Sequence, residues 1–169
     1  MLLTIDLVCE AEARVPISED EIQAICEMVL AEEGVTRPCY LSLSIVDDEE
    51  IRSYNAEWRG IDAVTDVISL ECERPDDPDL AEDEPCELGD IVLAPAFIQA
   101  QSGRYATTFA DEFRLLLIHG LLHLLGYDHL EDDEAEVMEA REDVLVRMAH
   151  TDAPISHVVL TRHREGEDA

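Results

Sequence analysis

Lysine is missing from this sequence of 169 residues, and all 11 basic residues are arginines, against 41 aspartates and glutamates. The resulting formal net charge of −30 at pH 7 creates a surface that repels nucleic acid at long range. Taken alone, this charge argues against an RNA or DNA partner. A polyanionic substrate would need a local arginine cluster or a metal ion to overcome the overall field.

Long apolar runs and paired cysteines are missing as well. The longest apolar run, 115–125, is interrupted by two histidines and falls short of the ~18–20 residues that a membrane span needs. The first ten residues lack the basic and apolar regions of a signal peptide. The five cysteines are odd in number and contain no CxxC pair, which argues against a disulfide framework and favours a reducing compartment. We therefore expect a cytoplasmic protein with no membrane segment.

Hydrophobic periodicity predicts an α+β fold (α/β-like), with a small mixed sheet of about four strands packed with about five helices. Strands are expected at 2–9, 39–46, 66–70 and 88–94, and helices between 18 and 34, 47 and 58, 95 and 102, 107 and 125, and 133 and 149. The last two strands are expected to form an antiparallel hairpin, which is spanned by the solvated acidic loop 71–87.

Residues 1–149 are expected to form a single metal-dependent hydrolase domain, and residues 150–169, which show no periodicity, a flexible C-terminal tail. Ser18, followed three residues later by Glu21, predicts a capping box at the start of the first helix. The apolar stripe of the last helix is predicted to consist of Val137, Met138, Arg141, Val144, Leu145 and Met148.

The segment 119–129 (HGLLHLLGYDH) predicts a metal site on the central helix and the turn that follows it. Histidines four residues apart lie on one face of a helix, so His119 and His123 can share an ion. A glycine at position 126 lets the chain turn sharply and bring His129 back to the pair. Three imidazoles leave one position of a zinc ion open, as in catalytic sites. We expect one Zn²⁺ per chain, although nickel, cobalt or iron also suit three histidines.

The same spacing is that of the metzincin proteases, in which the residue after the first histidine is a glutamate that acts as general base. Here that residue is Gly120, which cannot transfer protons. Its presence in a helix indicates either the close approach of a substrate or another chain, or a packing notch. Glu112, seven residues before His119, lies on the same stripe and is a candidate supporting residue or base.

The histidine segment resembles the signature of the bacterial YbeY family of endoribonucleases and rRNA maturation factors. Two further blocks of that family's pattern are present along the chain. They are Asn55, Trp58, Arg59, Asp62, Thr65, Asp66, Val67, Ile68 and Ser69 in the first block, and Leu88, Gly89, Asp90 and Ile91 in the second. The resemblance covers roughly residues 1–149, while the tail and the acidic loop depart from the family core.

This resemblance implies a single-strand-specific endoribonuclease of 16S rRNA 3′-end maturation and ribosome quality control. It also implies a zinc ion on His119, His123 and His129, and a functionally important Arg59. The guanidinium of Arg59 matches a phosphate, although an ion pair with Asp62 or Asp66 would be an alternative role. Asp66 is also expected to bond backbone amides at the entry to its strand, and Asp128 either to orient His129 or to cap the turn.

Three functions therefore remain open. The first is a metal-dependent endoribonuclease with RNA, the ribosomal small subunit or a ribosomal protein as partner. The second is a metzincin-like metalloprotease, which the spacing allows but Gly120 disfavours. The third is a non-catalytic ribosome-assembly factor, in which zinc holds two helices together and the acidic surface binds a basic ribosomal protein.

Overall fold

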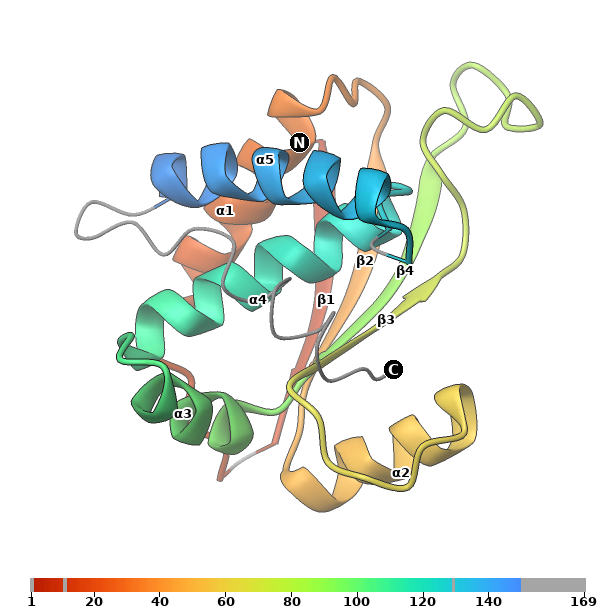
Figure 1. Cartoon of the computed structure of the whole chain (residues 1–169). Helices are drawn as coiled ribbons and strands as arrows, with labels where there is room; N and C mark the ends of the chain where they lie inside the picture. The colour runs from red at the N-terminus through yellow and green to blue at the C-terminus, as the bar shows by residue number, and fades with distance from the viewer. Residues whose placement is uncertain (1, 11, 129, 150–169) are drawn as a thin grey trace.

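The computed structural model describes residues 2–10, 12–128 and 130–149, and these form five helices and a four-stranded mixed sheet. The predicted α+β class is confirmed, with helices stacked mainly on one side of the strands (Figure 1). In chain order the elements are β1 (Leu3–Cys9), α1 (Glu19–Glu32), β2 (Cys39–Ile45), α2 (Asp48–Arg59), β3 (Val67–Glu71), β4 (Cys86–Leu93), α3 (Pro95–Arg104), α4 (Phe109–Leu124) and α5 (Asp132–Ala149).

The sheet has the strand order β1-β2-β4-β3. Strand β2 pairs in parallel with both β1 and β4, while β3 pairs antiparallel with β4. The predicted hairpin of the last two strands is thus confirmed, and it places β3 at an edge of the sheet.

The acidic loop between β3 and β4 spans 72–85, slightly less than predicted, because β4 begins at Cys86. Arg37, which lies outside the loop, binds three of its backbone carbonyls, and Leu80 of the loop packs against the main core. Arg37 donates from Nε to the carbonyl of Pro75 at 3.0 Å and from Nη1 to the carbonyls of Ala81 and Glu84 at 2.7 and 2.5 Å. The loop is therefore anchored largely through its backbone, while most of its acidic residues are exposed.

Alternation along the strands divides the apolar residues into two clusters, one on each face of the sheet. Leu41, Leu43 and Ile45 of β2 belong to the main core under α1 and α4. Ile68 and Val92 point the other way and pack with Ile51 of α2 in a smaller cluster. Helix α2 consequently covers one end of the opposite face, and α5 packs on α4 (Figure 1).

Helix α4 is the central element because most of its residues are buried, and it packs on the sheet and on α1, α3 and α5. It begins after Thr108, whose hydroxyl accepts from the amide of Asp111 at 3.1 Å, a capping bond worth about 1 kcal/mol. Apolar residues fill every side of its middle turns, so a polar side chain there is conspicuous. Two histidines of the predicted metal site, His119 and His123, belong to this helix.

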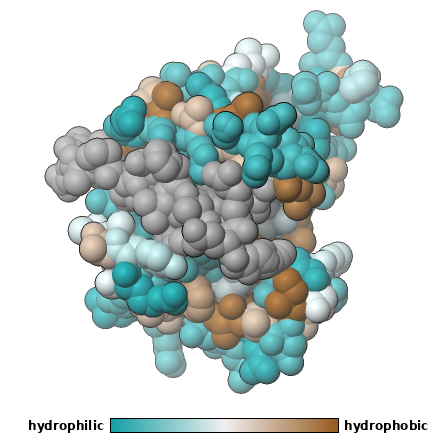
Figure 2. Space-filling view, in the orientation of Figure 1, coloured by the Kyte–Doolittle hydropathy of each residue, from teal (hydrophilic) through white to brown (hydrophobic). Residues whose placement is uncertain are grey.

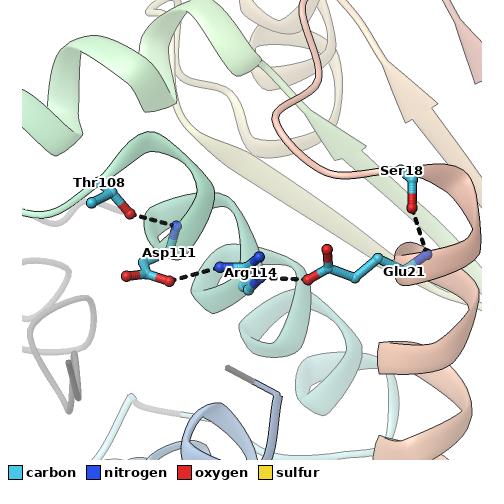
Figure 3. Close-up of polar contacts among 5 residues, drawn as sticks. All are labelled: Ser18, Glu21, Thr108, Asp111 and Arg114. Atoms are coloured by element: carbon cyan, nitrogen blue, oxygen red, sulfur yellow. Dashed lines mark hydrogen bonds and ion pairs between the residues drawn. The ribbon is translucent and has the colours of Figure 1, made fainter. Parts of the chain in front are cut away.

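An ion-pair relay joins α4 to the start of α1 (Figure 3). Ser18 caps α1 as predicted and accepts from the amide of Glu21 at 3.1 Å. The Glu21 carboxylate does not complete a capping box, however, since it accepts from Arg114 Nε at 2.6 Å. Arg114 also donates to Asp111 at 2.8 Å. A charge-assisted bond to another helix has replaced the local one.

The buried stripe of α5 differs from the predicted one. Met138 and Leu145 are buried as predicted, but Val137, Val144 and Met148 are 58%, 41% and 50% exposed. The stripe that faces α4 consists of Ala135, Met138, Glu142, Leu145 and Val146. Helix α5 carries apolar residues on two faces, and only the face that contacts α4 is buried.

The described surface is predominantly hydrophilic on the face seen in Figure 2, in keeping with the net charge of −30. Apolar residues appear there as small separate patches rather than as one continuous area. Each helix in the described part of the chain is either too short or too polar to cross a lipid bilayer.

Candidate metal centre

His119 and His123 lie one turn apart on α4, with their ring centroids separated by 4.8 Å. The rings meet edge to face, at an interplanar angle of 85°. His119 is 1% exposed, whereas His123 is half-buried. The structure thus brings two of the predicted ligands together, with one of them open to the surface.

The ring of His119 is held by a carboxylate on α5. Its Nδ1 lies 2.8 Å from Oε2 of Glu142, and both side chains are buried. A ligand that binds a metal through Nε2 carries its proton on Nδ1, where a carboxylate can accept it. This contact leaves Nε2 of His119 as the nitrogen that could bind a metal, with Glu142 as its supporting carboxylate.

The ring of His123 is held by the turn that follows α4. Its Nδ1 lies 3.0 Å from the carbonyl oxygen of Tyr127. The hydroxyl of Tyr127 in turn donates to Glu33 at 2.6 Å, and Arg141 Nε donates to the same carboxylate at 2.8 Å. Burial, with the hydrogen bond to Glu33, raises the pKa of Tyr127. The phenol therefore remains neutral and donating at physiological pH.

The pair fits a transition-metal ion, because each histidine has its Nδ1 against an oxygen acceptor and would bind through Nε2. His129, the third predicted ligand, lies outside the described residues, and so does its predicted contact with Asp128. The three-histidine site stays a prediction.

Gly120 faces the sheet rather than the histidine pair. A Cβ atom there would lie 3.1 Å from Ser69 Oγ, 3.3 Å from Ile91 Cγ2 and 3.4 Å from Val67 Cγ2. Ser69 donates its hydroxyl proton to the carbonyl of Gly120 at 3.1 Å. The glycine lets α4 pack closely on β3 and β4, and a glutamate side chain would collide with the sheet.

Two other predicted residues, Asp66 and Glu112, meet in a buried polar network near the start of α4. Gln101 of α3 donates from Nε2 to Asp66 Oδ2 and to Glu112 Oε2, at 3.0 Å each. Asp66 also accepts from the amide of Val67 at 2.7 Å, and Glu112 from the hydroxyl of Thr107 at 2.9 Å. The network joins α3, α4 and the entry to β3.

Arg59 is the last residue of α2, and its side chain is exposed. Gly60 ends the helix in the left-handed conformation, at φ 71°. Asp62, one of the two acids considered as its partner, accepts from Arg52 at 2.7 Å. The role of Arg59 in binding phosphate stays a prediction.

Sequence reasoning missed Glu142, Gln101 and Thr107 as parts of these networks. A signal was present for Glu142, since it lies four residues after Met138 and three before Leu145, on the stripe that proves to be buried. A carboxylate on a buried helical stripe requires a partner. Gln101 and Thr107 carry no comparable pattern, since neither lies between apolar residues on a helical stripe that would demand a partner.

The fold is shared with the solution structure of TM1509 from Thermotoga maritima, at a TM-score of 0.59 and 23% identity. The two structures match over 86% of this chain and 89% of that one. This similarity defines the class of protein as an α+β domain of that architecture.

Residues 8–150 match the family described as Endoribonuclease YbeY. A protein of that name from Exiguobacterium sp. is 41% identical over 129 residues, which cover 73% of this chain and 82% of that protein. Another, from Rhizobium meliloti, is 39% identical over 164 residues, covering 89% and 95%. The chain belongs to the YbeY family.

Proposed function

We propose that this chain is a metal-dependent endoribonuclease that holds one zinc ion on His119, His123 and His129. Its substrate is single-stranded RNA, and its place in the cell is the cytoplasmic maturation of the 16S rRNA 3′ end and ribosome quality control. Membership of the YbeY family and the names of the relatives support the ribonuclease activity. Nickel or another divalent transition metal could replace zinc on such ligands.

The observation that carries the proposal is the orientation of the two described histidines. Both have Nδ1 against an oxygen, at 2.8 Å in His119 and 3.0 Å in His123, on one face of one helix. Imidazoles held in this way favour metal binding through Nε2 over a purely structural role.

The chemistry suits a phosphodiester in a chain of this charge. A bound zinc ion supplies positive charge and Lewis acidity to a phosphoryl oxygen. Arg59 offers a planar guanidinium that can donate two parallel hydrogen bonds to a phosphate. RNA also carries its own nucleophile, the 2′-hydroxyl, so positioning the phosphate and stabilising its charge can replace a strong protein base.

The metalloprotease alternative is disfavoured by the surroundings of position 120. In metzincins this position supplies the general base. Here the Cα–Cβ direction points at Ser69 and Ile91, so the position has no room for a carboxylate near the histidines.

The test is cleavage of a single-stranded RNA by the zinc-reconstituted protein, with metal content measured in parallel. We expect His123→Ala to lose both the metal and the cleavage. Arg59→Ala should keep the metal and lose cleavage by 10²-fold or more, as is typical when a group that stabilises transition-state charge is removed. Arg52→Ala is the matched control on the same helix and should cleave RNA at the normal rate.

Full cleavage by both His123→Ala and Arg59→Ala would contradict the proposal. Metal retention without RNA turnover in the wild type would favour the assembly-factor function, in which the ion holds helices together. Chelator-sensitive hydrolysis of a protein substrate would restore the protease.

A further inference from the structure

Helix α5 contacts His119 of the candidate centre directly. It is linked to His123 through two intervening residues, Glu33 and Tyr127. Its neighbouring residues Arg141 and Glu142 carry opposite charges and reach different histidines. Glu142 lies 2.8 Å from His119 Nδ1, and Arg141 holds Glu33, which accepts from the Tyr127 hydroxyl. The carbonyl of Tyr127 faces His123 Nδ1. Two adjacent residues of α5 thus begin two chains of contacts that end on the two histidines.

We propose that Glu142 and the chain Arg141–Glu33–Tyr127 are positioning groups that hold His119 and His123 in the Nδ1–H tautomer, ready to bind a metal through Nε2. The proposal rests on the metal site of the proposed function, and it assigns roles to residues outside the histidine motif. It divides them into a charged support for His119 and a neutral backbone support for His123.

The support for His119 is the stronger one. Glu142 is 0% exposed and His119 1%, so their hydrogen bond forms away from water, where charge-assisted bonds are strongest. A carboxylate that accepts from Nδ1 fixes the tautomer and increases the electron density at Nε2. Glu142 therefore affects both the direction and the basicity of the ligand.

The support for His123 depends on the geometry of a turn. Gly126, at φ 108°, ends α4, and the amide of Tyr127 donates to the carbonyl of Leu122 at 3.1 Å. This bond holds the start of the turn against the last turn of the helix, and the Tyr127 carbonyl faces His123 Nδ1 at 3.0 Å. The Tyr127 side chain then fastens the turn to Glu33 at the end of α1 and, through it, to α5. Contacts with α4, the end of α1 and α5 thus hold the turn that carries the Tyr127 carbonyl oxygen.

The tautomers can be tested without any metal. Long-range ¹H–¹⁵N spectra of the metal-free, full-length protein, at about pH 8 where imidazole is neutral, distinguish Nδ1–H from Nε2–H. We expect Nδ1–H for both histidines in the wild type. Glu142→Ala should shift His119 toward Nε2–H and leave His123 unchanged. Glu142→Gln retains an oxygen acceptor, so we expect His119 to keep Nδ1–H in this variant. If Glu142→Ala fails to fold, the zinc affinity of Glu142→Gln tests the proposal instead.

Zinc affinity, measured by competition with a chelator, is the second readout. Glu142→Gln should weaken zinc binding about 10- to 100-fold, the usual effect of losing a supporting carboxylate. Tyr127→Phe removes the hydroxyl but keeps the carbonyl, so we expect a smaller loss of less than about 10-fold. Glu136→Gln makes the same chemical change at an exposed position of α5 and should have no effect.

Met138→Ala is the control for packing, because it loosens α5 without removing a polar contact of the histidines. A wild-type His119 in the Nε2–H form would overturn the proposal. So would a Glu142→Gln variant with normal zinc affinity, or a Met138→Ala variant that loses as much affinity as Glu142→Gln. A protein that shows the expected tautomers and affinities but cleaves no RNA would contradict the proposed function and leave this inference standing.

Discussion

Ser69 of β3 and Gly120 of α4 are joined by a hydrogen bond of 3.1 Å, from the hydroxyl to the backbone carbonyl. The bond fixes α4 against the edge strand β3 at the residue next to His119. It also identifies position 120 as a point of close packing, with consequences that can be measured.

Gly120→Ala should destabilise the protein by about 1–2 kcal/mol, because the new methyl group meets three sheet side chains at 3.1–3.4 Å. This net loss already includes the gain of ~1 kcal/mol that alanine brings to a helix interior, because the packing cost is about 2–3 kcal/mol. Gly103→Ala, on α3 with nothing within 4 Å, should be stabilising or neutral by urea unfolding. Equal stabilisation by both changes would show that α4 does not pack as closely as described.

Gly89→Ala should be far more damaging, since Gly89 has a φ of 130° and its Cβ would lie 2.1 Å from the carbonyl oxygen of Leu70. The contact is with backbone of the neighbouring strand, which cannot move aside. We expect a loss of more than about 3 kcal/mol or failure to fold. Gly34→Ala, at φ 76° with nothing within 4 Å, should cost only the ~1–2 kcal/mol of the left-handed conformation. Similar losses in the two variants would contradict the contact.

Cys26 should make stability fall at alkaline pH, because burial raises the pKa of its thiol from 9.0 to about 12. A raised pKa means that the native state retains the proton after the unfolded state has lost it. The contribution is therefore complete below pH 9 and is lost as the pH rises toward 12. Cys26→Ala should show a shallower decline between these values, whereas the exposed Cys9→Ala should match the wild type. Parallel curves for Cys26→Ala and wild type would refute this assignment.

The net charge of −30 predicts that moderate salt will act in opposite directions on folding and on RNA binding. Screening relieves the repulsion among carboxylates and so raises the free energy of unfolding. The same screening weakens contacts between arginine and phosphate and so lowers the affinity for RNA. Unfolding curves and binding titrations at about 50 and 200 mM potassium chloride test both effects. If salt changed the free energy of unfolding and the RNA affinity in the same direction, charge would not dominate one of these two quantities.

Elements with strong local signals could be predicted from the sequence. The cap at Ser18, the start of α4 at one of the neighbouring threonines Thr107 and Thr108, and the antiparallel pairing of β3 with β4 all follow from local patterns. The histidine pair is of the same kind, since a spacing of four on a helix determines that the rings meet.

Features that depend on another element could not be predicted in the same way. Glu21 has the spacing of a capping box, yet its carboxylate pairs with Arg114, 93 positions away. On α5 two stripes compete, and only contact with α4 decides that Glu142 is buried while Val137 and Val144 are exposed. The spacing of Glu142 from Met138 and Leu145 was a signal for its burial, but tertiary packing decides which of the two stripes is buried and that its partner is His119.

The position of β4 between β2 and β3 has a consequence for the order of events during translation. Strand β2 leaves the ribosome with β1 on one side, but its other neighbour starts only at Cys86. Until β4 emerges, β2 presents an open edge, and Leu41 and Leu43 lack the cover that α4 gives them later. The nascent chain therefore passes through a long interval in which its central strand can pair with foreign strands. The many carboxylates of the chain would keep such partners, and other copies of itself, at a distance during that interval.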